Sequence, residues 1–274
     1  MKVSGNLAKM KTSLENGEAH YQLPVGDERL PMNELIGKSL QLKYEGEINC
    51  IACGRKVKKS FSQGYCYPCF SSLAQCDMCI VKPESCHYFA GTCREPQWAD
   101  EHCMQDHVVY LANSSGIKVG ITRGTQIPTR WMDQGATQAL PIYRVKNRLI
   151  SGKVEVVIKQ HVADKTDWRR MLKGEAEGLD LGMRRDELLA ECQQEIKKIE
   201  TEYGSDAVKF LDNEKQVEIC YPVTEYPIKV TSFNFDKAPL VQGTLMGIKG
   251  QYLIFDSGVI NIRKFGGYKV TVST

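Results

Sequence analysis

Cys50-Ile51-Ala52-Cys53 and, after twelve intervening residues, Cys66-Tyr67-Pro68-Cys69 form two C-x-x-C pairs near the start of the chain. Each pair can place two thiolates about 2.3 Å from a tetrahedral zinc ion. Glycine at positions 54 and 64 suits the tight turns that surround such a knuckle. We therefore expect one structural Zn²⁺ bound by these four cysteines, because this spacing is unusual for cysteines that are merely buried.

The block that contains these pairs, residues 50–107, is rich in further metal ligands. It holds nine of the eleven cysteines and three of the five histidines. The remaining candidates exceed the four positions of a second zinc site, and two ligand sets stay open. The all-thiolate set comprises Cys76, Cys79, Cys86 and Cys93. The mixed set comprises Cys76, Cys79, Cys103 and His107. Four thiolates also suit an iron–sulfur cluster, although the strict ferredoxin spacings are missing from this block.

The composition is that of a folded protein. The chain has 274 residues, 42% of them hydrophobic and 25% charged, which predicts two or three domains and excludes gross disorder. Its formal net charge of +3 gives no overall sign of a polyanion partner. The N-terminus has no apolar signal core, and no stretch approaches the ~20 apolar residues that cross a bilayer. We expect a cytoplasmic protein without a membrane partner, in which paired cysteines bind metal rather than form disulfides.

Periodicity predicts both strands and helices outside the cysteine-rich block. Residues 21–25 and 39–44 alternate between apolar and polar side chains, and glycine-punctuated strand patterns return in residues 217–274. Between these regions, residues 108–112 and 117–121 are strand-like and flank an Asn-Ser-Ser-Gly turn, which predicts a hairpin. From Ile150 onward the apolar residues recur at helical spacing, and this places Glu155 on a helix.

Residues 107–173 resemble the GIY-YIG nuclease superfamily. The residues that carry this resemblance are Val109-Tyr110-Leu111, Ile117-Lys118-Val119-Gly120-Ile121-Thr122, Arg130 and Glu155. The likeness is greatest to members with a K-[IV]-G-I-T second strand. The whole chain also resembles an uncharacterised bacterial family in which a cysteine-rich zinc block precedes such a segment.

The resemblance implies a catalytic role for five residues. Tyr110 matches the tyrosine of the first strand, Gly120 the glycine of the second, Arg130 the arginine of the first helix and Glu155 the metal-binding glutamate. Lys118 stands where the better-known enzymes have a second tyrosine. Phosphodiester hydrolysis needs a divalent cation, a base and a positive charge near the phosphate. Glu155 can hold Mg²⁺ or Mn²⁺, Arg130 can clamp the phosphate, and Tyr110 or Lys118 can assist proton transfer.

Local charge favours a nucleic-acid partner, either DNA or RNA. Residues 108–163 carry eight basic and two acidic side chains, whereas residues 174–206 carry ten acidic and four basic ones along an amphipathic helical pattern. Candidate contacts to nucleic acid are basic residues of the knuckle and of the second strand, and one aromatic residue that could stack on a base: Arg55, Lys56, Lys58, Lys59, Arg123 and Trp131. The alternatives are a solvated basic loop and a buried aromatic side chain.

Together these features predict an α+β protein in five parts. They are an N-terminal β platform (1–49), a zinc-knuckle block (50–107), a GIY-YIG-like α/β core (108–173), an acidic amphipathic helix (174–206) and a small C-terminal β barrel or sandwich (207–274). The function expected first is that of a zinc-stabilised, divalent-metal-dependent nuclease. A nucleic-acid-binding protein that does not cleave, and a zinc-stabilised scaffold that binds proteins through the acidic helix, are the alternatives.

Overall fold

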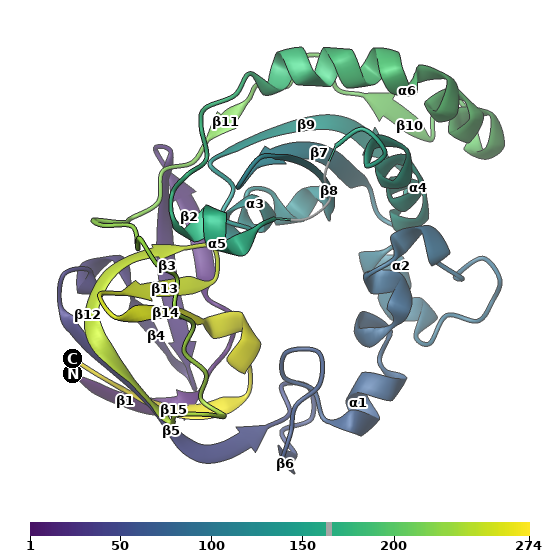
Figure 1. The fold of residues 1–274 in the computed structure, drawn as a ribbon. Coiled ribbons are helices and arrows are strands. Elements are labelled where there is room, and N and C mark those ends of the chain that lie inside the picture. Colours follow the sequence, from purple (N-terminus) through teal and green to yellow (C-terminus); the bar gives the residue numbers. More distant parts are fainter. Residues whose placement is uncertain (163–165) are drawn as a thin grey trace.

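The computed structural model describes residues 1–162 and 166–274, and its strands form three antiparallel sheets (Figure 1). Helices accompany these sheets, so the α+β class is confirmed. No helix in the part of the chain that the structure describes is long and apolar enough to cross a membrane.

The largest sheet joins the two ends of the chain. Its seven strands have the order β1-β15-β5-β12-β13-β14, with β6 on the edge of β5. Register pairs Lys2 with Ser273, so the termini lie side by side (Figure 1). Both ends of this strand order are open, and the described residues form no closed barrel, which was one of the two expectations for the C-terminal part. The strands are β1 (Lys2–Asn6), β5 (Ser39–Asn49), β6 (Lys56–Val57), β12 (Leu240–Lys249), β13 (Tyr252–Phe255), β14 (Gly258–Asn261) and β15 (Tyr268–Ser273).

A three-stranded sheet and three short helical segments complete this terminal unit. The sheet has the order β2-β3-β4, and its apolar side chains join those of the large sheet in one core. Alternation in β3 buries Ala19, Tyr21 and Leu23, as period-two strand patterning predicts. The elements are β2 (Lys11–Glu15), β3 (Glu18–Val25), β4 (Glu28–Pro31), η1 (Asn33–Leu35), η6 (Ile262–Phe265) and α5 (Trp168–Leu172).

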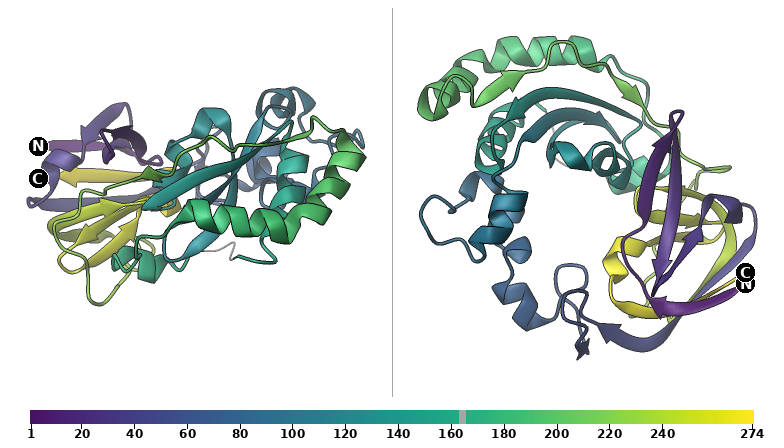
Figure 2. Two further views of the ribbon diagram at one scale, coloured as in Figure 1. Left: turned by 90° about the horizontal axis from the view of Figure 1, so that it is seen from above. Right: turned by 180° about the vertical axis from the view of Figure 1, so that it is seen from behind.

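The five-stranded sheet provides the scaffold of the candidate site. Its order is β10-β9-β7-β8, with β11 also paired to β9, and the predicted hairpin is formed by β7 and β8. One face packs against α4 and α6, and α6 runs along the outside of the molecule (Figure 2). The other face carries Tyr110 and packs against α3. The elements are β7 (His107–Asn113), β8 (Ile117–Arg123), η5 (Gly124–Gln126), α3 (Thr129–Asp133), β9 (Gln138–Val145), α4 (Arg148–Ile158), α6 (Leu181–Tyr203), β10 (Val208–Phe210) and β11 (Val217–Glu218).

The helices of this sheet follow from capping and periodicity. Asn147 accepts a hydrogen bond from the backbone N–H of Ile150 at the start of α4, and Asp180 accepts one from Met183 at the start of α6. In α6, Leu188, Cys192, Ile196 and Ile199 form the buried stripe, so the predicted amphipathic helix is confirmed over Leu181–Tyr203.

The cysteine-rich block connects the terminal unit to the five-stranded sheet. It consists of short helical turns, so backbone hydrogen bonds alone give it little structure. In Figures 1 and 2 the terminal unit, this block and the five-stranded sheet follow one another around an arc. The helical segments are α1 (Tyr67–Ser72), η2 (Ala74–Cys76), η3 (Met78–Ile80), η4 (Pro83–Ser85) and α2 (Pro96–His102).

Gly152 allows the block to approach α4 closely. A Cβ atom at this position would lie 2.4 Å from the backbone nitrogen of Glu84 and 2.6 Å from the carbonyl carbon of Pro83. Because both neighbours are backbone atoms, Gly152→Ala must push η4 away from α4, and we expect a loss of about 2–3 kcal/mol of unfolding free energy. The urea midpoint measures this loss. Gly178→Ala, where a Cβ meets nothing within 4 Å, is the control, and equal midpoints for the two variants would refute close packing at Gly152.

Candidate functional site

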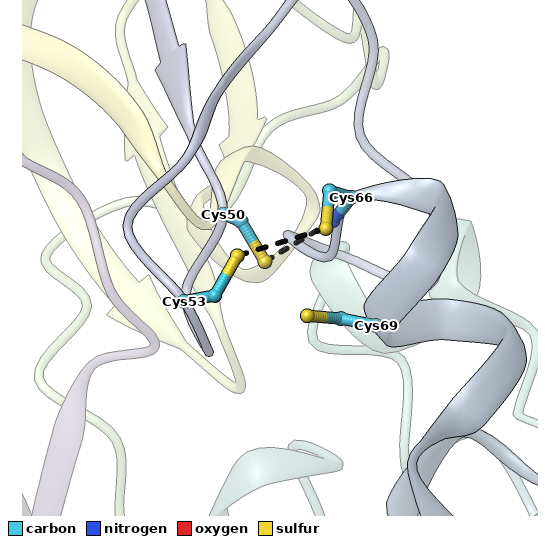
Figure 3. Close-up of side chains that lie close together, drawn as sticks. All are labelled: Cys50, Cys53, Cys66 and Cys69. Carbon is cyan, nitrogen blue, oxygen red and sulfur yellow. Dashed lines mark hydrogen bonds between the residues drawn. The ribbon is translucent and has the colours of Figure 1, made fainter.

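The four cysteines of the two C-x-x-C pairs meet at one point (Figure 3). Their sulfur atoms all lie within 4.8 Å of one another, and the Sγ atoms of Cys53 and Cys66 are 3.7 Å apart. Four sulfurs at about 2.3 Å from a central zinc ion stand about 3.8 Å apart, so the observed spacing fits a tetrahedral site. Of the four ligands predicted from sequence, all are brought together.

Local structure explains this convergence. Cys50 follows directly after β5, and a turn in which the Gly54 N–H donates to the Cys50 carbonyl returns Cys53 toward it. Cys66 precedes α1, whose first turn carries Cys69. The backbone N–H of Cys66 also donates to the sulfur of Cys50 at 3.2 Å. This contact joins the two halves of the knuckle.

The protonation of these thiols depends on their mutual contacts. Burial acts to raise the pKa of Cys50, but N–H groups of Cys66, Cys53 and Ala52 outweigh it and lower that pKa to about 6. The neighbouring thiol of Cys66, followed by desolvation, raises the pKa of Cys69 to about 12. One sulfur therefore carries negative charge readily while its neighbour resists a second charge, and a divalent cation would relieve that repulsion.

Of the other five cysteines of the block, four line one cavity and Cys76 lies outside it. Cys79, Cys86, Cys93 and Cys103 line one small cavity of about 10 Å³. Cys76 does not line it, because two consecutive 3-10 turns with Asp77 extended between them replace the knuckle turn that the C-x-x-C spacing predicts. His107 begins β7 as a buried residue whose Nδ1 contacts the carbonyl of Gln105, and burial lowers its pKa to about 4. Asp77, Cys79 and His87 form a three-residue group within 4.8 Å.

A larger cleft of about 800 Å³ lies where the terminal unit, the cysteine-rich block and the five-stranded sheet face one another. We call it the basic cleft, because cations dominate its charged lining. The basic residues that line it are Lys9, Lys118, Arg123, Arg130, Arg148 and Arg263. Among the described residues that line it, Glu155 is the one carboxylate. Walls of low dielectric and one sign of charge concentrate anions in such a space.

Four of the five residues singled out by the nuclease resemblance line the basic cleft. Lys118 and Gly120 come from β8, Arg130 from α3 and Glu155 from α4. Lys118 is only 6% exposed, and its Nζ donates to the hydroxyl of Thr166 at 2.7 Å. Side chains from three separate elements therefore face one space.

Tyr110 lies directly behind this lining. It is opposite Gly120 in the β7–β8 register, and a Cβ at position 120 would stand 2.7 Å from the tyrosine hydroxyl. The hydroxyl is buried and makes no hydrogen bond of normal geometry within the described residues, with Arg130 and Gln134 as its polar neighbours. Burial raises the pKa of Tyr110, although the charge of Arg130 opposes this. Tyr110 is therefore a neutral group near pH 7 and not a ready base.

Several candidate nucleic-acid contacts lie elsewhere. Arg55, Lys56, Lys58 and Lys59 are exposed and do not line the basic cleft, and Lys56 pairs with Glu47 at 2.9 Å. Trp131, the candidate for stacking on a base, is 2% exposed and packs edge-on against Tyr110 with ring centroids 6.0 Å apart. The inward face of α3 buries its indole, so stacking by Trp131 does not fit the structure. Arg123 does line the cleft.

The prediction from sequence did not include three of the basic residues that line the cleft. Lys9 and Arg263 come from the terminal unit, and Arg148 precedes Glu155 by two turns of α4. Burial, and then the nearby charge of Arg130, lower the pKa of Arg263. Two guanidinium groups that repel one another across one cleft favour an anion between them. Only the spacing of Arg148 and Glu155 on one helix could have been recognised beforehand.

Comparison with known proteins gives one family. No curated protein and no solved structure matches the chain. A family model matches residues 37–270, which include the four-cysteine knuckle and all the lining of the basic cleft except Ala8 and Lys9. The chain therefore belongs to the family described as Protein of unknown function (DUF2797).

Proposed function

We propose that this protein is a divalent-metal-dependent nuclease that hydrolyses phosphodiester bonds of DNA or RNA in the basic cleft. The observation that carries the proposal is the convergence of Lys118, Arg130 and Glu155 on one cleft of about 800 Å³, with Gly120 beside them and Tyr110 behind. These are the residues that the likeness to the GIY-YIG superfamily singles out. Six cations and one carboxylate suit a site for a polyanion and a metal ion.

The charged side chains fit the requirements of this reaction. Glu155 offers a hard oxygen ligand in a cleft with room for water, which suits Mg²⁺ or Mn²⁺ because such ions are often held by one or two carboxylates. The bound cation would polarise the phosphate and lower the pKa of a bound water. Arg130 and Arg263 bind and orient the phosphate oxygens from two sides. Lys118 holds a proton at Nζ near the reacting group, and Tyr110 lies behind these residues as a neutral neighbour of Arg130.

One observation favours a second function, nucleic-acid binding without cleavage. Tyr110 is fully buried with a raised pKa, so it does not supply the base that the better-known enzymes use. Cleavage would then depend on Lys118 or on a water molecule activated by the cation that Glu155 would hold. A protein that binds nucleic acid without cleaving it would still need the basic residues of the cleft. Its affinity for nucleic acid would not depend on Glu155.

A panel of labelled substrates tests the proposal. Single-stranded, duplex and branched DNA and structured RNA are incubated with purified zinc-loaded protein in Mg²⁺, in Mn²⁺ or in EDTA. The EDTA incubation is kept short enough that the protein retains its zinc. We expect cleavage of at least one substrate with Mg²⁺ or Mn²⁺ and none with EDTA. Salt-dependent binding without cleavage would support the binding protein instead. An absence of salt-sensitive binding to every substrate would support the protein-binding scaffold.

Arg263→Gln is expected to weaken nucleic-acid binding about tenfold, because it removes one charge-assisted contact worth about 1.5 kcal/mol. The slope of log K against log salt should also fall by about one. Fluorescence anisotropy of a labelled strand at salt concentrations between about 50 and about 200 mM measures both quantities. Lys264→Gln is the matched control, because the adjacent lysine is exposed and does not line the cleft. Equal effects of the two substitutions would contradict binding in the cleft.

A further inference from the structure

Four cysteines outside the first zinc knuckle surround a second small cavity. Cys79 comes from η3, Cys86 follows η4, Cys93 lies in the next loop and Cys103 follows α2. All four line one cavity of about 10 Å³, although they span twenty-five positions of the sequence. No three of these four sulfur atoms all lie within 4.8 Å of one another, so the thiols share a cavity wall but are less tightly clustered than those of the first knuckle. Such short turns have few backbone hydrogen bonds of their own, and a bound ion would draw the thiols together and stabilise the loops that carry them.

We propose that Cys79, Cys86, Cys93 and Cys103 bind a second structural zinc ion. This ligand set differs from both sets that the sequence leaves open, since it excludes Cys76 and His107 and unites Cys93 with Cys103. Four thiolates are a typical ligand set of structural zinc. A cavity of about 10 Å³ has the volume of roughly one water-sized sphere, which fits a single ion. An iron–sulfur cluster contains several metal and sulfide atoms and needs more room.

A second group of possible zinc ligands, Asp77, Cys79 and His87, lies next to the four-cysteine set, but polar contacts already engage two of its members. Asp77, Cys79 and His87 lie within 4.8 Å, but the Asp77 carboxylate already accepts an ion pair from Arg94 with Nε–Oδ2 at 2.7 Å. His87 also has partners, with Nδ1 at 2.8 Å from the Thr92 hydroxyl and Nε2 at 3.5 Å from Asp77. These contacts make Asp77 and His87 suited to orienting the ligand loops.

A basic residue that also lines the basic cleft compensates the negative charge of the proposed second site. Zinc with four thiolates carries a net charge of −2, and burying it requires a positive neighbour. Arg148 provides this charge, since it is partly buried and interacts electrostatically with Cys79 and Cys103. Its Nη2 donates to the carbonyl of Ile80 at 2.6 Å, and its backbone N–H donates to the carbonyl of Cys103 at 2.8 Å. Both acceptors are at or next to the proposed ligands.

The second zinc would thereby fix the start of α4. Arg148 opens this helix, Gly152 contacts η4 one turn later, and Glu155 follows on the same helix facing the basic cleft. The proposed ion holds the loops against which these residues pack. It acts as a positioning element for Glu155, and this consequence rests on the proposed function while the site itself does not.

Metal content and coordination test the second site. Native mass spectrometry of the wild-type chain should show two zinc ions, Cys93→Ser should keep one, and Cys76→Ser, the matched cysteine outside the cavity, should keep two. Cys53→Ser should lose the other ion while retaining the second. One zinc in the wild-type chain, or two zinc ions in Cys93→Ser, would overturn the proposal, as would iron with acid-labile sulfide.

X-ray absorption of the wild-type protein decides the ligand set even if Cys93→Ser does not fold. Two sites of four cysteines give an average of four sulfur neighbours per zinc at about 2.3 Å and no light-atom shell. Ligation by Asp77 and His87 would add oxygen and nitrogen at about 2.0 Å, which would contradict the all-thiolate set. Neither measurement depends on nuclease activity, so failure of this proposal and failure of the nuclease proposal are distinguishable.

Discussion

Glu155→Gln is expected to lower the single-turnover cleavage rate about a thousandfold, while the affinity for nucleic acid stays within about threefold of the wild-type value. The amide keeps the size and polarity of the side chain but cannot supply the anionic oxygen that a divalent cation requires. Glu155 is also the one carboxylate among the described lining residues of the basic cleft, so no second acid replaces it there. Single-turnover kinetics and anisotropy measure rate and affinity separately.

Glu101→Gln provides the control for this substitution. Glu101 lies exposed on α2 and does not line the cleft, so the same chemical change there should leave both quantities unaltered. Equal cleavage by the wild-type protein and by Glu155→Gln would remove Glu155 from the reaction. Loss of binding together with cleavage would indicate that Glu155 supports the fold of the cleft and not the chemical step.

Cys66→Ser is expected to remove one zinc ion and to lower the midpoint of thermal unfolding by about 10 °C, since a loss of several kcal/mol costs roughly 2–4 °C for each kcal/mol in a chain of this size. Cys66 is 1% exposed and lies 3.7 Å from Cys53, and a serine hydroxyl is a poor zinc ligand. Zinc supplies about 10–16 kcal/mol to the folding of isolated knuckles. The effect here is smaller because separate apolar cores hold the sheets together.

Calorimetry and metal analysis by mass spectrometry measure this prediction together. Cys220→Ser is the control, because Cys220 is exposed and lies far from the knuckle in the sequence. It should keep the wild-type metal content and midpoint. An unchanged midpoint in a Cys66→Ser protein that has lost its zinc would show that the knuckle does not stabilise the fold.

The features that sequence predicted best are those set by neighbouring residues. The spacing of Cys50, Cys53, Cys66 and Cys69 determines a knuckle because each pair needs only one tight turn. The β7–β8 hairpin and the helix that carries Glu155 also follow from local patterns of turns and apolar residues. No long-range contact is required to define any of these elements.

The remaining features depend on contacts between distant parts of the chain. Lys9 and Arg263 reach the basic cleft because β1 pairs with β15 across most of the sequence, which no local pattern reveals. The spacing of Cys76 and Cys79 predicted a shared site, but two 3-10 turns direct only Cys79 into the small cavity. Trp131 was a candidate for stacking on a base, but the core between α3 and Tyr110 buries it, which is the alternative that the sequence left open.

The most direct test of the proposed nuclease is the dependence of its cleavage rate on Mn²⁺ concentration, measured for the wild-type protein and for Glu155→Asp at equal zinc content. The aspartate retains the charge but withdraws it from the cleft by one methylene group. We predict that cleavage saturates with Mn²⁺ in the wild-type protein and needs a higher Mn²⁺ concentration in the variant. A cleavage rate that does not change with Mn²⁺ concentration would contradict a catalytic cation held by Glu155. The same dependence of rate on Mn²⁺ concentration in the two proteins would also contradict it.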